Sequence, residues 1–420
     1  MAAGLQPART VLPNGVTLIT KQTTRTPAVT LCLSLGCGSI ADPPDSGGAA
    51  HLLSRVIDRG TTTRTAADIA DALDNRGISI SVSASRQLFS LTCTCLAEDF
   101  EVVFDLFGDI LMCPTIPADE LATRKLLVAT GLRQDEDSPA VRAVECFMEL
   151  LYGTDHPYGR RVKGTRASVE ALTRERLLAI HRARFGPDRL TAIVVGDVAA
   201  SRIEDCAGKV LGDWQPSTRD VPPLMPAPAP ASRRFVAVPM MNKAQTDIAY
   251  GFLSIARSDP SYYAYLLMNN ILGQYALGGR LGDSIRERQG MAYYVSSSFS
   301  DTSIVPAPLV IRAGVAAENV ERAVASIDEE LQALRRRGVT GRELAESRQY
   351  LVGSLPRSLE TNAGMVSFLQ NAEFFGLGLD YDVRLPTLLT MVTIDEVNAA
   401  GQALDPDRAT IVVAGPYQQE

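Results

Sequence analysis

His51 is the residue whose type and position come nearest to metal chemistry. It lies in a stretch, residues 49–58, whose apolar positions recur with helical spacing and whose polar positions fall on the opposite face. A histidine on such a face can bind zinc, but a catalytic zinc site takes three protein ligands. The next positions on that face are Ser54 and Arg55, and Arg55 would place a permanent cation where a second ligand belongs. The helix therefore has the layout of a metal site without its ligands.

Composition limits the classes of protein to which the chain can belong. Of its 420 residues, 46% are hydrophobic and 21% are charged, and no apolar run is long enough to span a bilayer. This length exceeds one ordinary hydrophobic core, so we expect about two to four domains. The formal net charge of −7, without a cluster of lysine and arginine, argues against nucleic acid as a partner.

Hydrophobic patterning predicts alternating strands and helices in the first half. Alternating runs indicate a hairpin over 11–19, a strand over 29–35, an antiparallel pair over 78–84 and 89–95, and a strand over 190–195. Helical spacing predicts helices over 49–58, 65–76, 99–112, 119–134, 140–152 and 175–185. Strand pairs separated by helices are typical of the α+β class.

The second half repeats features of the first. In segment 185–196 a Pro-Asp-Arg turn precedes a short apolar strand, and segment 404–415 has the same pattern. The equivalent arginines, Arg189 and Arg408, are 219 positions apart. A repeated pattern of this length predicts an internal duplication of one α+β sandwich.

A proline-rich segment separates the two halves. Residues 216–232 hold six prolines interleaved with alanine, a composition that predicts an extended linker. We therefore expect an N-terminal domain over 1–215, this linker, and a C-terminal domain over 233–420 that includes a strand at 309–315 and a long helix at 319–337.

The duplicated halves, the glycine-rich loop before the His51 helix and the Arg-Gly-Thr at 59–61 resemble the M16 peptidases. The resemblance to this pitrilysin-like or inverted zincin family covers essentially the whole chain and is strongest for its short two-domain M16B members. It implies two homologous α/β sandwich domains of the LuxS/MPP-like metallohydrolase fold. In catalytic members the helix carries His-x-x-Glu-His, in which two histidines bind zinc and the glutamate activates water.

Matched to that motif, this chain keeps only the first histidine. Ser54 stands at the position of the glutamate base, Arg55 at that of the second histidine, and Gly131 at that of the distal glutamate ligand. Neither Glu136 nor Glu145 would replace the missing base and second imidazole. The resemblance therefore implies no metal in this chain and no peptidase activity of the chain alone, and it makes His51 an ordinary hydrogen-bonded helix histidine.

Segment 278–295 resembles a second M16 signature, small-Arg-Leu…Leu-Arg-Glu-x-x-Gly-Leu-Ala-Tyr. It places Arg286 and Tyr293 seven positions apart, as in the arginine/tyrosine pair that binds the scissile carbonyl in the family. A guanidinium fork and a phenol hydroxyl are suitable donors to an oxygen that gains charge. Tyr294 would point to the other side of a strand, so we favour Tyr293. The alternative is an ordinary ion pair of Arg286 with Glu287 and a packed strand tyrosine.

The resemblance implies a non-catalytic M16B subunit that supplies Arg286 and Tyr293 to a partner subunit. That partner would hold the zinc and cleave unfolded peptides. The alternative is a non-proteolytic peptide-binding or scaffold protein, like the M16 relatives in respiratory complexes or in maturation of a peptide-derived cofactor. A third interpretation, an active enzyme with unorthodox ligands, predicts stoichiometric zinc in the isolated chain.

The expected compartment is the bacterial cytoplasm. The N-terminus has no charged segment followed by an apolar one, and the seven cysteines include no CxxC pair, a pattern typical of free thiols. The alternative is a periplasmic protein whose signal peptide has been removed.

Overall fold

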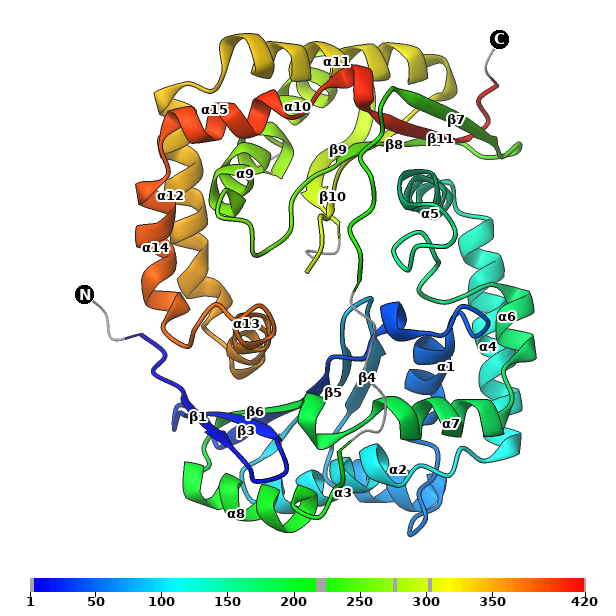
Figure 1. Cartoon of the computed structure of the whole chain (residues 1–420), viewed down its shortest axis with the longest axis vertical. Helices are drawn as coiled ribbons and strands as arrows, with labels where there is room; N and C mark the ends of the chain where they lie inside the picture. Colours follow the sequence, from blue (N-terminus) through cyan, green and yellow to red (C-terminus); the bar gives the residue numbers. More distant parts are fainter. Residues whose placement is uncertain (1–3, 217–223, 275–277, 301–303, 419–420) are drawn as a thin grey trace. The chain divides into compact units, whose positions relative to one another are not determined.

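A computed structural model describes residues 4–216, 224–274, 278–300 and 304–418 (Figure 1). The chain divides into two compact units. Unit 1 comprises Met1–Leu132, Arg161–Pro223 and Pro356–Asp382, and unit 2 comprises Arg133–Arg160, Leu224–Leu355 and Val383–Glu420. Each unit therefore includes a segment from the other half of the sequence, which the expected limits of 1–215 and 233–420 did not contain.

Unit 1 is built on a six-stranded sheet with the order β1-β2-β6-β3-β5-β4. β2 and β6 are parallel, and the other neighbours are antiparallel. The strands are β1 (Ala8–Val11), β2 (Thr17–Gln22), β3 (Ala28–Leu35), β4 (Ile80–Ala84), β5 (Phe89–Leu96) and β6 (Leu190–Gly196). The helices are α1 (Ala49–Val56), α2 (Ala66–Asp74), α3 (Phe100–Met112), α4 (Ala118–Glu136), α6 (Arg166–Ala171), α7 (Arg174–Arg184), α8 (Ala200–Leu211) and α13 (Asn362–Phe374), with short turns η1 (Ser39–Ala41) and η2 (Pro187–Arg189).

Unit 2 is built on a five-stranded sheet with the order β7-β11-β8-β10-β9. β7 and β11 are parallel, and the other neighbours are antiparallel. The strands are β7 (Arg234–Pro239), β8 (Thr246–Leu253), β9 (Ala292–Phe299), β10 (Pro308–Val315) and β11 (Thr410–Gly415). The helical elements are α5 (Pro139–Tyr152), α9 (Tyr262–Asn269), η3 (Asn270–Gln274), α10 (Gly279–Leu281), η4 (Gly282–Arg288), η5 (Ala317–Asn319), α11 (Val320–Arg337), α12 (Gly341–Ser358), α14 (Tyr381–Met391), α15 (Ile394–Gln402) and η6 (Pro406–Arg408).

The α+β class predicted from the sequence is confirmed. The hairpin forms as β1 and β2, and the alternating runs form the antiparallel pair β4 and β5. α2 begins where a capping motif predicts it, because the Thr65 side chain accepts from the Asp68 backbone and the Asp68 carboxylate accepts from that of Thr65. In the expected linker, residues 217–223 lie outside the described part, and residues 224–232 form no helix or strand.

The central strands of both sheets are buried on both faces. In β3, β6, β8 and β11 nearly every residue is buried, and their sequences are almost continuously apolar. A strand of this kind needs a cover on each side of its sheet, because two-sided burial is what makes such a sequence stable in water. In unit 1, one side is covered by the helices that follow in sequence, including α1, α3 and α8.

The second side of the unit 1 sheet is covered by α13, which comes from the far end of the sequence. Met365, Val366 and Leu369 pack there against a separate apolar cluster of strand residues that includes Ile19 and Ile193. Polar contacts fix the same helix, because the Asn362 side-chain amide donates to the Ala28 carbonyl at 3.0 Å and that of Gln370 donates to the Ser34 hydroxyl at 2.8 Å. The apolar burial supplies most of the stabilisation.

The equivalent side of the unit 2 sheet is covered by α5, which comes from the first half of the sequence. Ala143, Phe147 and Met148 are buried on this helix. The ring of Phe147 lies over β8 so closely that a Cβ at Gly251 would be 2.9 Å from its Cζ atom. Glycine at this position is therefore what allows the helix to approach the sheet.

We expect Leu369→Ala to lower the free energy of unfolding by about 2–5 kcal/mol, because it opens a cavity between α13 and the sheet of unit 1. Denaturant titration measures the loss, and hydrogen exchange at the amides of β3 and β6 locates it. Ser367→Ala, at an exposed position of the same helix, is the matched control and should change stability by less than about 0.5 kcal/mol. Equal effects of both variants would contradict this packing.

A buried histidine ties α7 to the end of α3. The Nε2 atom of His181 lies 2.8 Å from the carbonyl oxygen of Leu111, and its ring lies against Phe185 with the centroids 4.5 Å apart. Burial lowers the pKa of His181 to about 4, opposed by the hydrogen bond to Leu111 and assisted by the nearby charge of Arg182. His181 is therefore neutral at pH 7.

This pKa predicts a loss of stability in acid. Between about pH 6.5 and pH 4 the unfolded chain protonates this imidazole and the folded chain does not, so the free energy of unfolding falls as the pH falls, by about 3 kcal/mol for this group. NMR titration of the imidazole carbon signals, assigned with His181→Gln, should give a pKa about 2 units below that of a model histidine. A value near 6.5 would refute the assignment.

Candidate functional site

α1, the helix that carries His51, is positioned by its N-terminal loop. The two carboxylate oxygens of Asp42 accept hydrogen bonds from the backbone N–H groups of Gly48 and Ala50, each at 2.9 Å. A carboxylate at this end satisfies free N–H groups and favours the helix dipole. Gly48 has φ of +89°, and a Cβ there would lie 2.5 Å from the carbonyl oxygen of Lys163. The helix start thus depends on an aspartate cap and a glycine.

The structure describes the three α1 positions that correspond to the zinc motif. The side chains of His51 and Ser54 are buried, whereas that of Arg55 is exposed. The Ser54 hydroxyl donates to the His51 carbonyl at 2.7 Å, so it is used within the helix. No group on this helix can take the role of a general base, because a serine hydroxyl is far too weak a base at pH 7.

The expected distal ligand position, Gly131, lies in α4 and is half-exposed. A Cβ there would meet no neighbour within 4 Å, so the space is open but supplies no donor atom. Of the substitutes considered above, Glu136 is the last residue of α4. Glu145 is held within α5 by Arg142, whose guanidinium lies 3.0 Å from its carboxylate.

The residues present do not fit a zinc site. Zinc is bound in proteins by imidazole, thiolate and carboxylate groups, and these motif positions provide one imidazole, a hydroxyl, a guanidinium and a glycine. Throughout the described ranges of the chain, no group of three or more His, Cys, Asp or Glu side chains could hold a metal ion. No step of chemistry is therefore assigned to a metal held by this chain.

The other candidate residues lie in unit 2, where Arg286 belongs to the π-helical turn η4. Its side chain is 42% exposed, and its Nε atom lies 3.6 Å from a carboxylate oxygen of Glu287. The connection to the next strand is fixed, because the N–H of Gly290 donates to the Arg286 carbonyl at 3.0 Å and that of Met291 to the Ile285 carbonyl at 3.1 Å. The ion pair with Glu287 therefore forms as the alternative expected, with the guanidinium still accessible.

Tyr293 occupies an irregular position on the edge strand β9. In the pairing with β10, Val315 lies opposite Ala292 and Gly314 opposite Tyr294, so Tyr293 is the extra residue of a β-bulge. Its side chain is 83% exposed, and it is not the packed strand tyrosine that the alternative required. Bulges re-aim side chains and are over-represented beside active sites. The phenol is therefore available to a ligand.

The neighbouring Tyr294 has a structural role. Its hydroxyl hydrogen-bonds the carboxylate of Asp247, a buried residue of β8, and its ring lies against Arg312 with the guanidinium carbon 6.0 Å from the centroid. Burial, and secondarily the negative charge of Asp247, raise the pKa of Tyr294 well above its ordinary value. This contact keeps Tyr294 on the opposite side from Tyr293, as predicted. Asp247 itself was missed, although an acidic residue in an apolar strand is a signal for such a partner.

A second anchor precedes η4. Arg280 makes a two-point contact with Glu343 of α12, at 2.6 and 2.8 Å, and also donates to the Gly338 carbonyl at 2.9 Å. Burial alone would raise the pKa of Glu343, but hydrogen bonds from Arg280 and Thr340 lower it to about 2. Glu343 was noted in the sequence only as part of a repeat, because its distance of 63 positions from Arg280 hides the pairing.

Two sheet-based units of one strand order, with a capped helix at the position of a metal motif, define a protein of the two-domain metallohydrolase class. Two family models match it, the insulinase (peptidase family M16) model over residues 17–154 and the peptidase M16 inactive domain model over residues 171–351. The chain belongs to peptidase family M16. The predicted family is confirmed.

Several proteins are similar to this chain over nearly its whole length. An uncharacterized zinc protease of Mycobacterium tuberculosis is 27% identical, over 99% of this chain and 94% of that protein. The uncharacterized zinc protease YmxG of Bacillus subtilis is 25% identical, over 96% of this chain and 97% of that protein. A crystal structure titled as a peptidase M16 inactive domain from Pseudomonas fluorescens has a TM-score of 0.90 and 26% identity, covering 99% of this chain and 100% of that one.

Helices of membrane-spanning length and hydropathy are not found in the part of the chain that the structure describes.

We expect metal analysis of the isolated, purified chain to find far less than one zinc per chain, because the motif positions lack a second ligand. EDTA should leave its melting temperature unchanged. The third interpretation would return if zinc were stoichiometric and were lost in His51→Ala but kept in His156→Ala, the matched histidine control in unit 2.

Proposed function

We propose that this chain is the non-catalytic subunit of a heterodimeric M16B peptidase. The partner subunit supplies the zinc and the glutamate base, and this chain supplies Arg286 and Tyr293. The substrates are unfolded peptides. The guanidinium and the phenol donate hydrogen bonds to the scissile carbonyl oxygen, which gains negative charge as water attacks.

One observation carries this proposal, the contrast between the two candidate sites. The zinc-motif positions hold Ser54 and Arg55, which cannot serve as base or ligand. The donor positions hold Arg286 and Tyr293, both exposed and both in segments anchored by contacts of neighbouring residues. A chain that keeps donors and lacks the metal ligands is expected to complete a site whose metal lies elsewhere. One relative, a probable mitochondrial-processing peptidase of Schizosaccharomyces pombe, is named as a subunit beta and is 25% identical over 70% of this chain and 67% of that protein.

We infer further that the two halves of the chain arose by internal duplication. Once β1 is set aside, the two sheets have the same strand order and the same single parallel pair. Turns η2 and η6 have the same sequence, Pro-Asp-Arg, and each precedes the strand that joins the parallel pair. The helices α5 and α13, each in the unit of the other half, also occupy equivalent places.

The alternative function is a non-proteolytic peptide-binding or scaffold protein. It is favoured by the same absence of ligands at the motif positions. The two functions differ in one outcome. Co-purification from the native host should bring down an M16 protein with an intact His-x-x-Glu-His, and the complex should cleave unfolded peptides under the first function but not under the second.

In the reconstituted complex, we expect Arg286→Ala and Tyr293→Phe each to lower kcat by about 100-fold or more, because each removes a donor to the developing oxyanion. KM should change little, since the lost contact strengthens in the transition state. Initial rates on an unfolded peptide measure both constants.

Arg288→Ala is the matched control, because Arg288 lies in the same turn and is paired with Asp283 at 3.0 Å. It should leave kcat unchanged. Size-exclusion chromatography must show each variant still bound to the partner. The proposed role is wrong if the complex with both Arg286→Ala and Tyr293→Phe keeps the wild-type rate.

A further inference from the structure

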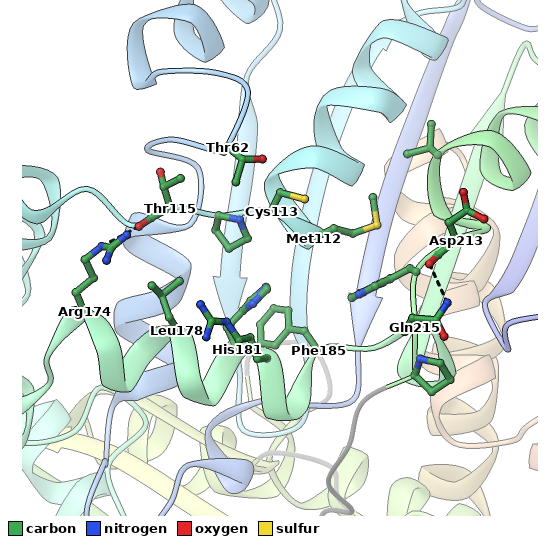
Figure 2. A pocket seen from close by; sticks show the side chains of 15 residues that line it. Thr62, Met112, Cys113, Thr115, Arg174, Leu178, His181, Phe185, Asp213 and Gln215 are labelled. Carbon is green, nitrogen blue, oxygen red and sulfur yellow. Dashed lines mark hydrogen bonds between the residues drawn. The ribbon is translucent and has the colours of Figure 1, made fainter.

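A cavity of about 770 Å³ lies within unit 1, away from both candidate sites in the sequence. It is formed by the end of α3 with the residues that follow it, by one face of α7, and by the end of α8 with the segment up to Pro216 (Figure 2). Its volume falls in the range of about 300–1,000 Å³ that is usual for small-molecule sites. Neither the proposed function nor the family resemblance assigns it a role.

The middle of this cavity is apolar and aromatic. Leu178 and Phe185 line it from α7, Val210 from α8, and Trp214 from the segment after α8. Trp214 is half-buried and is the only tryptophan of the chain. A planar or branched apolar group could lie between these side chains and be removed from water.

A buried hydrogen-bond acceptor faces the same space. His181 is 5% exposed, and its Nε2 atom must carry the proton, because the Leu111 carbonyl can only accept. In the neutral ring Nδ1 is then an acceptor. Nδ1 makes no hydrogen bond within the described residues and is not enclosed by protein, so it is open to the cavity that the ring lines. This atom calls for a ligand with an N–H or O–H group.

Two guanidinium groups stand on the same face of α7. Arg174 uses its Nε atom to donate to the carbonyls of Thr115 and Ile116, each at 3.0 Å, so that its terminal amino groups remain for a ligand. Arg182 is exposed and forms no ion pair within the described ranges. The acid of the lining, Asp213, lies beside Gln215 at the opposite end of the cavity from Arg174 (Figure 2). The α7 end is therefore cationic.

We propose that this cavity binds a small amphipathic carboxylate. Its apolar group lies against Phe185 and Trp214, its carboxylate meets Arg174 and Arg182, and an N–H or O–H group donates to Nδ1 of His181. An N-acylated aromatic or branched amino acid has this combination of groups, and N-acetyl-L-phenylalanine is the probe that tests it. The proposal is independent of the peptidase partnership, since all the residues belong to unit 1.

The single tryptophan provides the measurement. Titration of the whole chain with N-acetyl-L-phenylalanine should change the fluorescence of Trp214 saturably, with a dissociation constant on the order of 1 mM or below. N-acetyl-L-phenylalaninamide keeps the ring and the amide but lacks the charge, and it should bind about tenfold more weakly. Sodium acetate should cause no saturable change.

Arg182→Gln should weaken the carboxylate probe about tenfold and leave binding of the amide unchanged. Arg176→Gln is the matched control on the same helix, because Arg176 is turned toward Asp45 at 2.7 Å and does not line the cavity. The proposal is overturned if neither probe binds saturably, if both bind equally well, or if Arg182→Gln and Arg176→Gln have equal effects. The indole N–H signal in NMR spectra gives an independent readout of binding.

Discussion

The need to cover both faces of an apolar sheet governs this protein. β3, β6, β8 and β11 are buried on both sides, and neither half of the sequence supplies enough helices to cover its own sheet twice. Each sheet takes its second cover from the other half, α13 over the first sheet and α5 over the second. The division at residues 216–232 that the sequence suggests is thus a division of the chain, whereas the compact units are interleaved.

Local signals in the sequence predicted most elements of the first half and several of the second. Alternation identified β3 and β5, and the capping residues located α2 within about two residues. The placement of α13 was beyond such reasoning. Its apolar residues, Met365, Val366 and Leu369, mark one buried face, but a helical stripe does not say which sheet it covers. Pairings such as Arg280 with Glu343 escape for the same reason, since nothing local connects residues so far apart.

The candidate sites divide in a similar way. The resemblance to M16 peptidases identified the motif positions, and the chemistry of Ser54 and Arg55 ruled out zinc without any structure. The bulge at Tyr293 and the π-helical turn at Arg286 were not predictable, because both depend on register and on packing against neighbouring strands. The structure also explains why α1 persists without its metal ligands. The helix is set by Asp42 and Gly48, whose contacts do not involve the motif positions.

The interleaving of the units has a consequence for biosynthesis. A ribosome makes the chain from its N-terminus, and N-terminal domains generally fold first. The strands of the first sheet are complete once residue 196 has emerged, but the helix that shields their second face ends only at residue 374. During the intervening synthesis an apolar surface that includes Ile19 and Ile193 stays open to water. Nascent chains should therefore be clients of holding chaperones, and translational stalls in this interval should lead to aggregation more readily than stalls after it.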